Sequence, residues 1–157
     1  MSVFLRMRWL EPVLVAILAV LVTVVLANVI GRYLFGAGIT WADEMARFLF
    51  VWLTFLGAVL GLARGAHIGM DIVVATLPSV PARLLRLLAL GLMAVFLAVW
   101  AWYAIELVQR SMTFRPPALG VPRGYVYSVA PASALLMLVV CLHQFWRVLR
   151  GQEQIDA

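Results

Sequence analysis

Two pairs of polar residues in this sequence have the types and spacing that chemistry would need. Glu44 and Arg47 are three residues apart, so a carboxylate and a guanidinium can meet on the surface of a helix. Asp43 and Glu44 lie in the first turn of the same predicted helix, where the helix dipole favours carboxylates. His67 and Asp71 are four apart and can hydrogen-bond on a helix.

These residues do not make a metal or catalytic site. A metal wants three or four protein ligands, and the chain has only two histidines and one cysteine. The sequence has no plausible pairing of a nucleophile with a base and no glycine loop that would cradle a phosphate. We therefore expect no metal, no catalytic residue and no cofactor in this chain.

The composition places the chain in a membrane. Hydrophobic residues make up 66% of the 157 residues, charged residues make up 12%, and the mean hydropathy is +1.06. A soluble domain is about half apolar and a quarter charged, so this is the composition of an integral membrane protein. The arginines are scattered at the edges of apolar runs, as membrane anchors are, so we expect contact with lipid and none with nucleic acid.

The apolar runs predict an all-α membrane protein with four transmembrane helices. We expect spans at about 12–34, 41–63, 83–107 and 125–146, which form a single four-helix membrane domain over 1–157. The first run is longer than the core of a secretory signal peptide and is expected to be retained. Residues 68–77 are too few to span, and they predict a short interfacial helix between the second and third spans.

Small and polar residues at the ends and along one side of the second span predict contacts with other helices. Gly57 and Gly61 belong to a stripe of minimal bulk, and helices in lipid associate through such close backbone approach. Trp41 begins this span, and Trp52 places a second bulky side chain near its middle. In the first span, Asn28 is four residues from Arg32, either as part of an interfacial anchor or as a polar contact to a neighbouring helix.

No solute site is apparent in the spans. A carrier that works alone normally shows broken helices or charges near the membrane midplane, and the middles of all four predicted spans lack ionisable acids, histidines and arginines. The sequence therefore predicts that the chain is one part of a larger assembly. Four spans put both termini on one side, and a weak excess of arginines there predicts that this side is cytoplasmic.

The order of several motifs resembles a known family. Nearly the whole chain is similar to the small membrane subunit of TRAP (tripartite ATP-independent periplasmic) transporters. The similar motifs are Asn28-Val-Ile-Gly-Arg32, Trp41-x-x-Glu44-x-x-Arg47, Trp52-x-x-Phe55-x-Gly57, His67-Ile-x-x-Asp71, Arg115-Pro-Pro-Ala-Leu-Gly-Val-Pro122 and Ala130-Pro131.

The resemblance implies a multi-pass protein of the bacterial inner membrane that enlarges the static scaffold of a large permease subunit. That subunit would carry an organic acid together with sodium, so sodium is expected to bind there and not to this chain. A periplasmic solute-binding protein would deliver the substrate, and Arg115 and Arg123 are its possible contacts. The residues expected at the interface with the large subunit are Asn28, Arg32, Trp41, Glu44, Arg47, Trp52, Gly57, Gly61, His67 and Asp71.

Two other functions are compatible with the sequence. A small self-assembling exporter of the multidrug type would need an essential membrane carboxylate, for which Glu44 is the candidate, although Arg47 would neutralise it. A membrane cytochrome b-like subunit would use His67 and His143, which end the second and fourth spans on the same side, as haem ligands.

Overall fold

The computed structural model describes residues 7–64 and 78–150, and every regular element in these two stretches is a helix. A short 3₁₀ helix, η1 (Met7–Trp9), leads directly into α2 (Leu10–Leu34). The remaining elements are α3 (Ala42–Ala63), α5 (Ser79–Ser111), α6 (Arg123–Tyr127) and α7 (Val129–Leu149).

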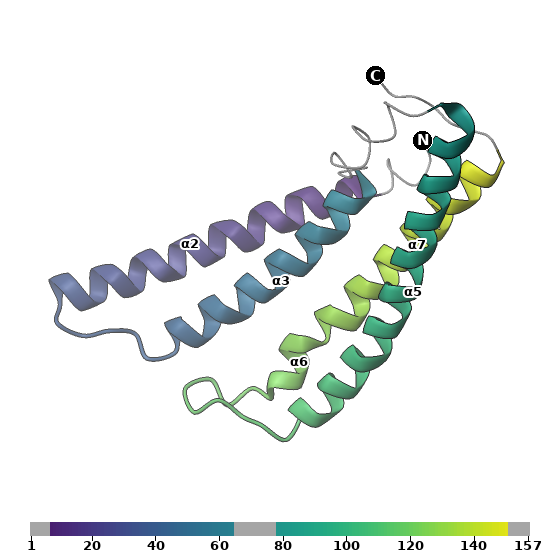
Figure 1. Ribbon diagram of the computed structural model, residues 1–157. Helices are drawn as coiled ribbons and strands as arrows, with labels where there is room; N and C mark the ends of the chain where they lie inside the picture. The colour runs from purple at the N-terminus through teal and green to yellow at the C-terminus, as the bar shows by residue number, and fades with distance from the viewer. Residues whose placement is uncertain (1–6, 65–77, 151–157) are drawn as a thin grey trace.

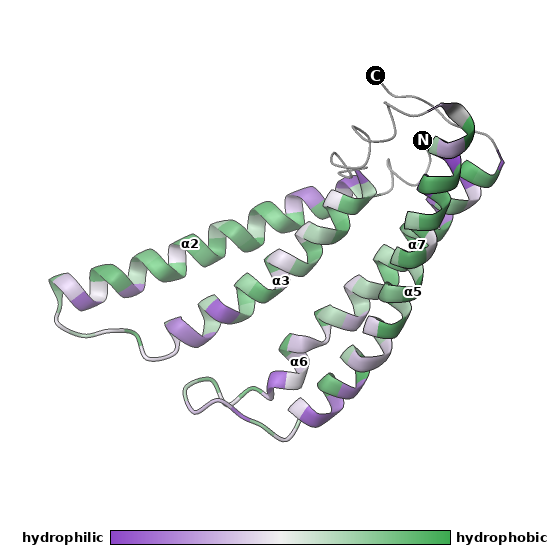
Figure 2. Ribbon diagram, viewed as in Figure 1, coloured by the Kyte–Doolittle hydropathy of each residue, from purple (hydrophilic) through white to green (hydrophobic). Residues whose placement is uncertain are grey.

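Four helical segments are long and apolar enough to cross a membrane, which confirms the predicted fold class. They are Met7–Leu34, Ala42–Ala63, Val80–Ser111 and Arg123–Leu149. Figure 2 shows hydrophobic residues along the middle of each helix and hydrophilic residues near the ends. The predicted interfacial helix at 68–77 lies outside the described residues.

Two helices depart from their predicted extent. The third is longer than predicted: it begins after Pro78, whose ψ of 156° is extended, and continues to Ser111. The fourth is divided at Ser128 into α6 and α7. Pro131 lies three residues further on, in the first turn of α7. Because proline has no backbone N–H, it cannot donate a hydrogen bond to the carbonyl of Tyr127. Helical hydrogen bonds continue across this division, from the Ser128 N–H to the Gly124 carbonyl and from the Ala132 N–H to the Ser128 carbonyl, so α6 and α7 form one span.

The helices form two antiparallel pairs, α2 with α3 and α5 with α7, joined mainly by packing of α3 on α7 (Figure 1). The pairs converge near the end of the molecule that carries Met7 and Arg150, which we call the terminal end. They diverge towards the other end, formed by the connections 35–41 and 112–122, which we call the loop end. This splay leaves most of α2 exposed, with only Leu10 and Asn28 buried.

The contact between α5 and α7 depends on small side chains near the loop end and larger ones further away. The buried residues there are Ala101 and Ala104 on α5, and Ala130, Ser133 and Ala134 on α7. Small side chains let two helix backbones approach closely in lipid, where apolar burial adds little drive. Towards the terminal end, a core of larger side chains contains Val59, Leu90, Leu97, Met137 and Cys141.

Gly124 fixes the contact between α6 and the end of α5. A Cβ atom added at this position would lie 2.6 Å from Met112 Sδ and 2.8 Å from the Val108 carbonyl oxygen. The backbone of α6 therefore lies directly against α5, and the second of these neighbours is a main-chain atom that cannot rotate away.

We expect Gly124→Ala to destabilise the protein by about 1–3 kcal/mol, because the added methyl group overpacks this contact. Thermal unfolding of the purified protein in detergent measures the effect. Gly91→Ala is the matched control, because a Cβ there meets nothing within 4 Å and alanine is the better helix former. Equal melting temperatures for the two variants would contradict the close contact.

Candidate functional site

Asn28 organises the loop end of the first helix pair. Its side chain is 93% buried, since its exposed fraction is 7%. Its Nδ2 donates to Asp43 Oδ1 at 3.0 Å, and its Oδ1 accepts from the Ile39 N–H at 2.8 Å. One amide thus ties α2 to both the connection and the first turn of α3. The bond to Asp43 is the polar contact to a neighbouring helix that the sequence suggested, and a contact of Asn28 with a partner subunit stays a prediction.

Two glycines, one in the last turn of α2 and one in the 35–41 connection, make this arrangement possible. The Gly31 carbonyl accepts from the N–H groups of Phe35 and Ala37, and a Cβ at Gly31 would lie 2.9 Å from the Ala37 oxygen. Gly36 has a φ of +65°, a conformation that L side chains rarely adopt. The chain therefore reverses tightly enough for Ile39 to reach Asn28.

Arg32 also turns towards its own chain. Its guanidinium lies 3.9 Å from Asp43 Oδ2, and both side chains are more than 60% exposed. An ion pair of this length and exposure adds little stability. Together with Asn28 and Asp43, Arg32 lines a small polar pocket between α2 and α3.

Glu44 joins the two helix pairs, and it does so without the predicted help of Arg47. Its Oε2 accepts from the Leu119 N–H at 2.9 Å, and its Oε1 accepts from the Ala118 N–H at 3.2 Å. These donors belong to a turn in which the Gly120 N–H bonds to the Pro116 carbonyl, with Gly120 at φ +66°. The carboxylate of α3 thus holds the connection between α5 and α6.

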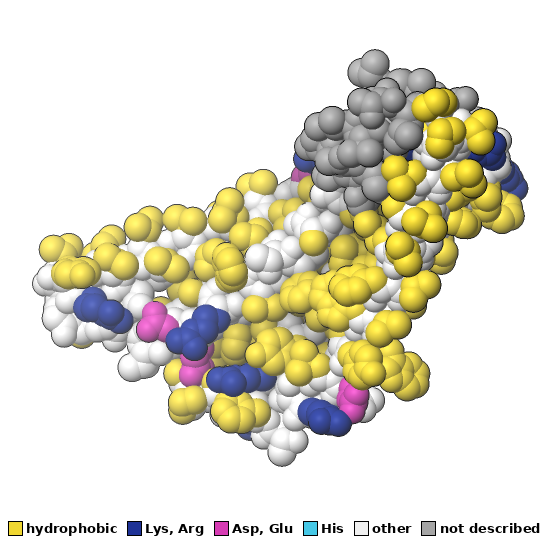
Figure 3. Space-filling model, viewed as in Figure 1, with side chains coloured by type: hydrophobic (Ala, Val, Ile, Leu, Met, Phe, Trp, Pro, Cys, Tyr) yellow, Lys and Arg dark blue, Asp and Glu magenta, His cyan; other side chains and the backbone are white. Residues whose placement is uncertain are grey.

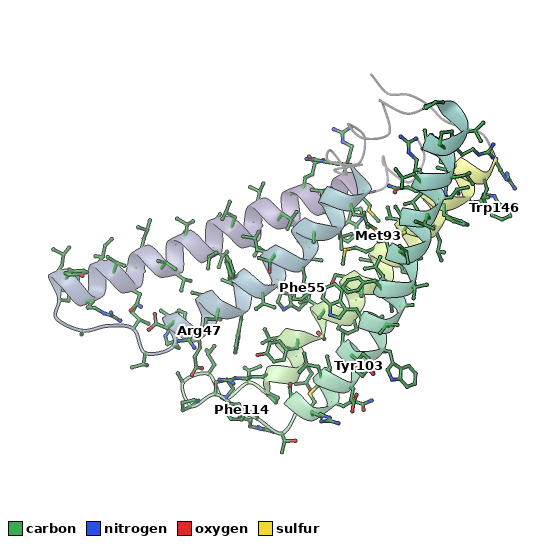
Figure 4. All side chains as sticks on the ribbon, viewed as in Figure 1. Arg47, Phe55, Met93, Tyr103, Phe114 and Trp146 are labelled. Carbon is green, nitrogen blue, oxygen red and sulfur yellow. The ribbon has the colours of Figure 1, made fainter. Side chains whose placement is uncertain are left out.

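Of the other predicted interface residues of α3, Arg47 and Trp52 are exposed, whereas Gly57 and Gly61 are half-buried. Arg47 is exposed and makes no hydrogen bond or ion pair with any residue in 7–64 or 78–150. Figure 4 places it at the loop end of α3. A Cβ at Gly57 or Gly61 would meet nothing within 4 Å, so no described residue fills the space beside them. Helical spacing puts all three on one side of α3.

The two tryptophans of the second span lie apart from this side. Trp41 immediately precedes α3 and is 41% exposed. Trp52 is 39% exposed and lines a groove between α3 and α6. The structure therefore does not bring the predicted interface residues into one cluster.

The two arginines of the 112–123 region differ in their surroundings. Arg115 is exposed, whereas Arg123 is partly buried. The Arg123 guanidinium lies 4.1 Å from the centre of the Phe114 ring, and the backbone N–H of Arg123 donates to the Phe114 carbonyl. Figure 3 shows charged side chains gathered along the loop end of the visible face.

The two histidines that were considered as haem ligands lie in different parts of the chain, and only His143 is among the described residues. His67 and Asp71 lie outside the described residues. His143 is exposed on α7. Within the described ranges, no group of three or more His, Cys, Asp or Glu side chains is placed to hold a metal ion.

Sequence reasoning missed two parts of this site, namely Asp43 as the partner of Asn28 and the backbone of Ala118 and Leu119 as the partner of Glu44. An asparagine near the end of an apolar span was a signal, because a buried amide needs partners. Backbone donors leave no such signal, since every residue except proline has one.

We expect Glu44→Gln to loosen the 112–122 connection, because an amide presents one acceptor and one N–H₂ group to two backbone donors. The cost should be about 1–2 kcal/mol, and cleavage of the connection by a protease should become faster. Glu106→Gln is the control. It removes the exposed i,i+4 pair with Arg110 and should cost less than about 0.5 kcal/mol. Unchanged cleavage in Glu44→Gln would contradict this role.

Comparison with known proteins identifies the family. Residues 21–151 match the family model of the DctQ component of tripartite ATP-independent periplasmic transporters. The C4-dicarboxylate TRAP transporter small permease protein DctQ of Rhodobacter capsulatus is 32% identical over 65% of this chain and 46% of its own length. The ectoine TRAP transporter small permease protein TeaB of Halomonas elongata is 30% identical over 81% of this chain and 67% of its own.

A third relative has a different architecture. The isethionate TRAP transporter permease protein DctMQ of Oleidesulfovibrio alaskensis is 29% identical over 90% of this chain, but the match covers only 22% of that protein. Together with four apolar helices, these matches make the chain a multi-pass protein of the inner membrane. The chain belongs to the DctQ family, the small permease subunits of TRAP transporters.

Proposed function

We propose that this chain is the non-catalytic scaffold subunit of a sodium-coupled TRAP transporter for organic acids, and that it braces a large permease subunit. The observation that carries this proposal is the charge-free interior of all four spans. No Asp, Glu, Lys, Arg or His occurs in 12–31, 48–63, 87–105 or 124–142. A solute and a sodium ion would find no binding groups there, so both would bind to the large subunit.

The names of three relatives support the proposed substrate class. C4-dicarboxylates and isethionate, for which two of them are named, are organic anions, and ectoine extends the range to another small polar solute. The binding protein and the large subunit would select among such solutes. This chain would affect the rate of transport through assembly only.

The large subunit would bind along the exposed side of α3. Arg47, Gly57 and Gly61 share this side, and the two glycines leave space that none of the residues in 7–64 or 78–150 fills. A helix of the partner would fit there by close backbone approach, with an acidic group opposite Arg47. The DctMQ relative supports such a partner, because its match to this chain is a minor part of a much longer permease protein.

The remaining predicted residues would act in other ways. Asn28, Arg32 and Glu44 would shape the surface from within, through the contacts described above. Trp41 would add a contact at the edge of the interface. The solute-binding protein would dock on the loop end, where Arg115 is an exposed cation on the 112–122 connection. This requires the loop end to face the periplasm and the termini to be cytoplasmic, as the arginine bias favours.

We expect Gly61→Leu to abolish co-purification with the large subunit while leaving this chain folded, because the leucine would occupy the space of the partner helix. Affinity purification of a tagged large subunit measures the loss, which should be at least about tenfold. Arg47→Gln should weaken the same contact. Gly91→Leu, also at an open glycine but on α5, is the control. Full co-purification of Gly61→Leu and Arg47→Gln would refute this interface.

Reconstitution into lipid vesicles tests whether this chain or the large subunit moves the solute. Vesicles that contain only this chain should take up no organic acid. Vesicles that also contain the large subunit should take it up when the binding protein and an inward sodium gradient are present. Solute movement by this chain alone would instead favour the exporter alternative and overturn the scaffold role.

A further inference from the structure

A groove opens between α3 and α6 at a depth that lies inside the membrane. Phe48 and Trp52 follow Ala42, the first residue of α3, by about 9 Å and 15 Å along the helix axis at a rise of 1.5 Å per residue. The hydrocarbon layer is about 30 Å thick, so the groove runs from one boundary region towards the midplane. Its walls are formed by Phe48, Leu49, Trp52, Tyr125 and Val126.

The groove is a consequence of the splay between the helix pairs. Towards the terminal end, α3 packs extensively against α7, whereas towards the loop end it makes only a small contact with α6. Glu44 lies one turn before Phe48 on the same face of α3, and its bonds to Ala118 and Leu119 bound the groove at the loop end. On the midplane side, Phe55 contacts Trp100 of α5 with ring centres 5.6 Å apart. The groove is therefore a short, shallow depression that is open to the surrounding lipid.

The chemistry of the walls selects hydrocarbon. Aromatic and aliphatic side chains line the groove, and water within it would lack the two to four polar partners that it needs. A helix from another protein would need an open face several turns long, whereas this groove spans little more than one turn of α3. A run of methylenes fits both the length and the chemistry.

The charge beside the groove points to the headgroup of the same molecule. Arg123 precedes Val126 by three residues, which places it on the same face of α6 at the loop end. Its guanidinium rests on the Phe114 ring, and its side chain donates no hydrogen bond to a described residue. The carboxylate of Glu44 is also at this end, but both of its oxygens accept backbone N–H groups.

We propose that the groove binds one phospholipid, which inserts the first part of an acyl chain between α3 and α6 and places its phosphodiester on Arg123. Arginine matches phosphate geometry with two parallel hydrogen bonds, and the Phe114 ring holds the guanidinium in place. The lipid would fill the space that the splayed helix pairs leave open. This site is separate from the exposed side of α3 that is proposed above for the large subunit.

Native mass spectrometry of the complex with the large subunit tests the site. The complex is stripped of lipid in detergent and then given dioleoyl-phosphatidylglycerol. Leu49→Trp fills the groove and Arg123→Gln removes the charge, and each should lower the lipid-bound fraction at least about fivefold. The controls are Leu92→Trp on the exposed face of α5 and Arg115→Gln on the connection. Both controls should bind as the wild type does.

Three outcomes would overturn the site. The lipid-bound fraction could be unchanged in both groove variants, or it could fall equally in the controls. Alternatively, Leu49→Trp could release the large subunit without changing lipid binding, which would show that a side chain of the partner fills the groove. Loss of lipid with normal assembly and uptake would support the lipid site and leave the scaffold role unaffected.

Discussion

The bond from Glu44 to two backbone N–H groups is the contact on which the loop end depends. The two helix pairs diverge there, so packing alone does not hold them together. A carboxylate that accepts two N–H groups makes charge-assisted hydrogen bonds, which are stronger than neutral ones. The turn from Pro116 to Gly120 supplies both donors from the backbone. One side chain thereby sets the distance between α3 and the α5–α6 connection.

The membrane explains why so few polar contacts suffice elsewhere. Each span satisfies its backbone groups within its own helix, as lipid requires. Side-chain bonds at the terminal end then add local ties, such as Arg64 to Glu11 and Gln144 to the Leu62 carbonyl. Because apolar surface facing lipid carries little penalty, α2 and α5 can remain widely exposed. An open bundle of this kind is suited to association with further helices.

The sequence was sufficient for the fold class but not for the internal contacts. Four apolar runs of spanning length predicted the four helices, because length and hydropathy are local properties. The division of the fourth helix at Ser128 was harder to place, since Pro131 acts on a carbonyl four residues earlier. The third helix extends beyond the predicted span of 83–107 at both ends, because a helix can continue past the part of it that crosses the membrane.

The candidate site shows the same limit at the level of single residues. Asn28, Arg32 and Glu44 were correctly selected as unusual, because polar groups at the ends of apolar spans need partners. Their partners, however, lie in this chain: Asp43 and Ile39 for Asn28, and the turn at Ala118 for Glu44. Local spacing suggested Arg47 for Glu44, whereas the actual donors are more than seventy residues away in the chain.

The use of main-chain donors by Glu44 has a consequence for sequence divergence. The Glu44 carboxylate accepts hydrogen bonds from backbone N–H groups, which every amino acid except proline possesses. Exchange of the side chain at position 118 or 119 for any residue except proline would therefore leave both donors in place, whereas exchange of Glu44, or of Gly120 at φ +66°, would disturb the contact. The surface of the 112–122 connection can thus change its side chains while the hydrogen bonds that hold it to α3 are kept.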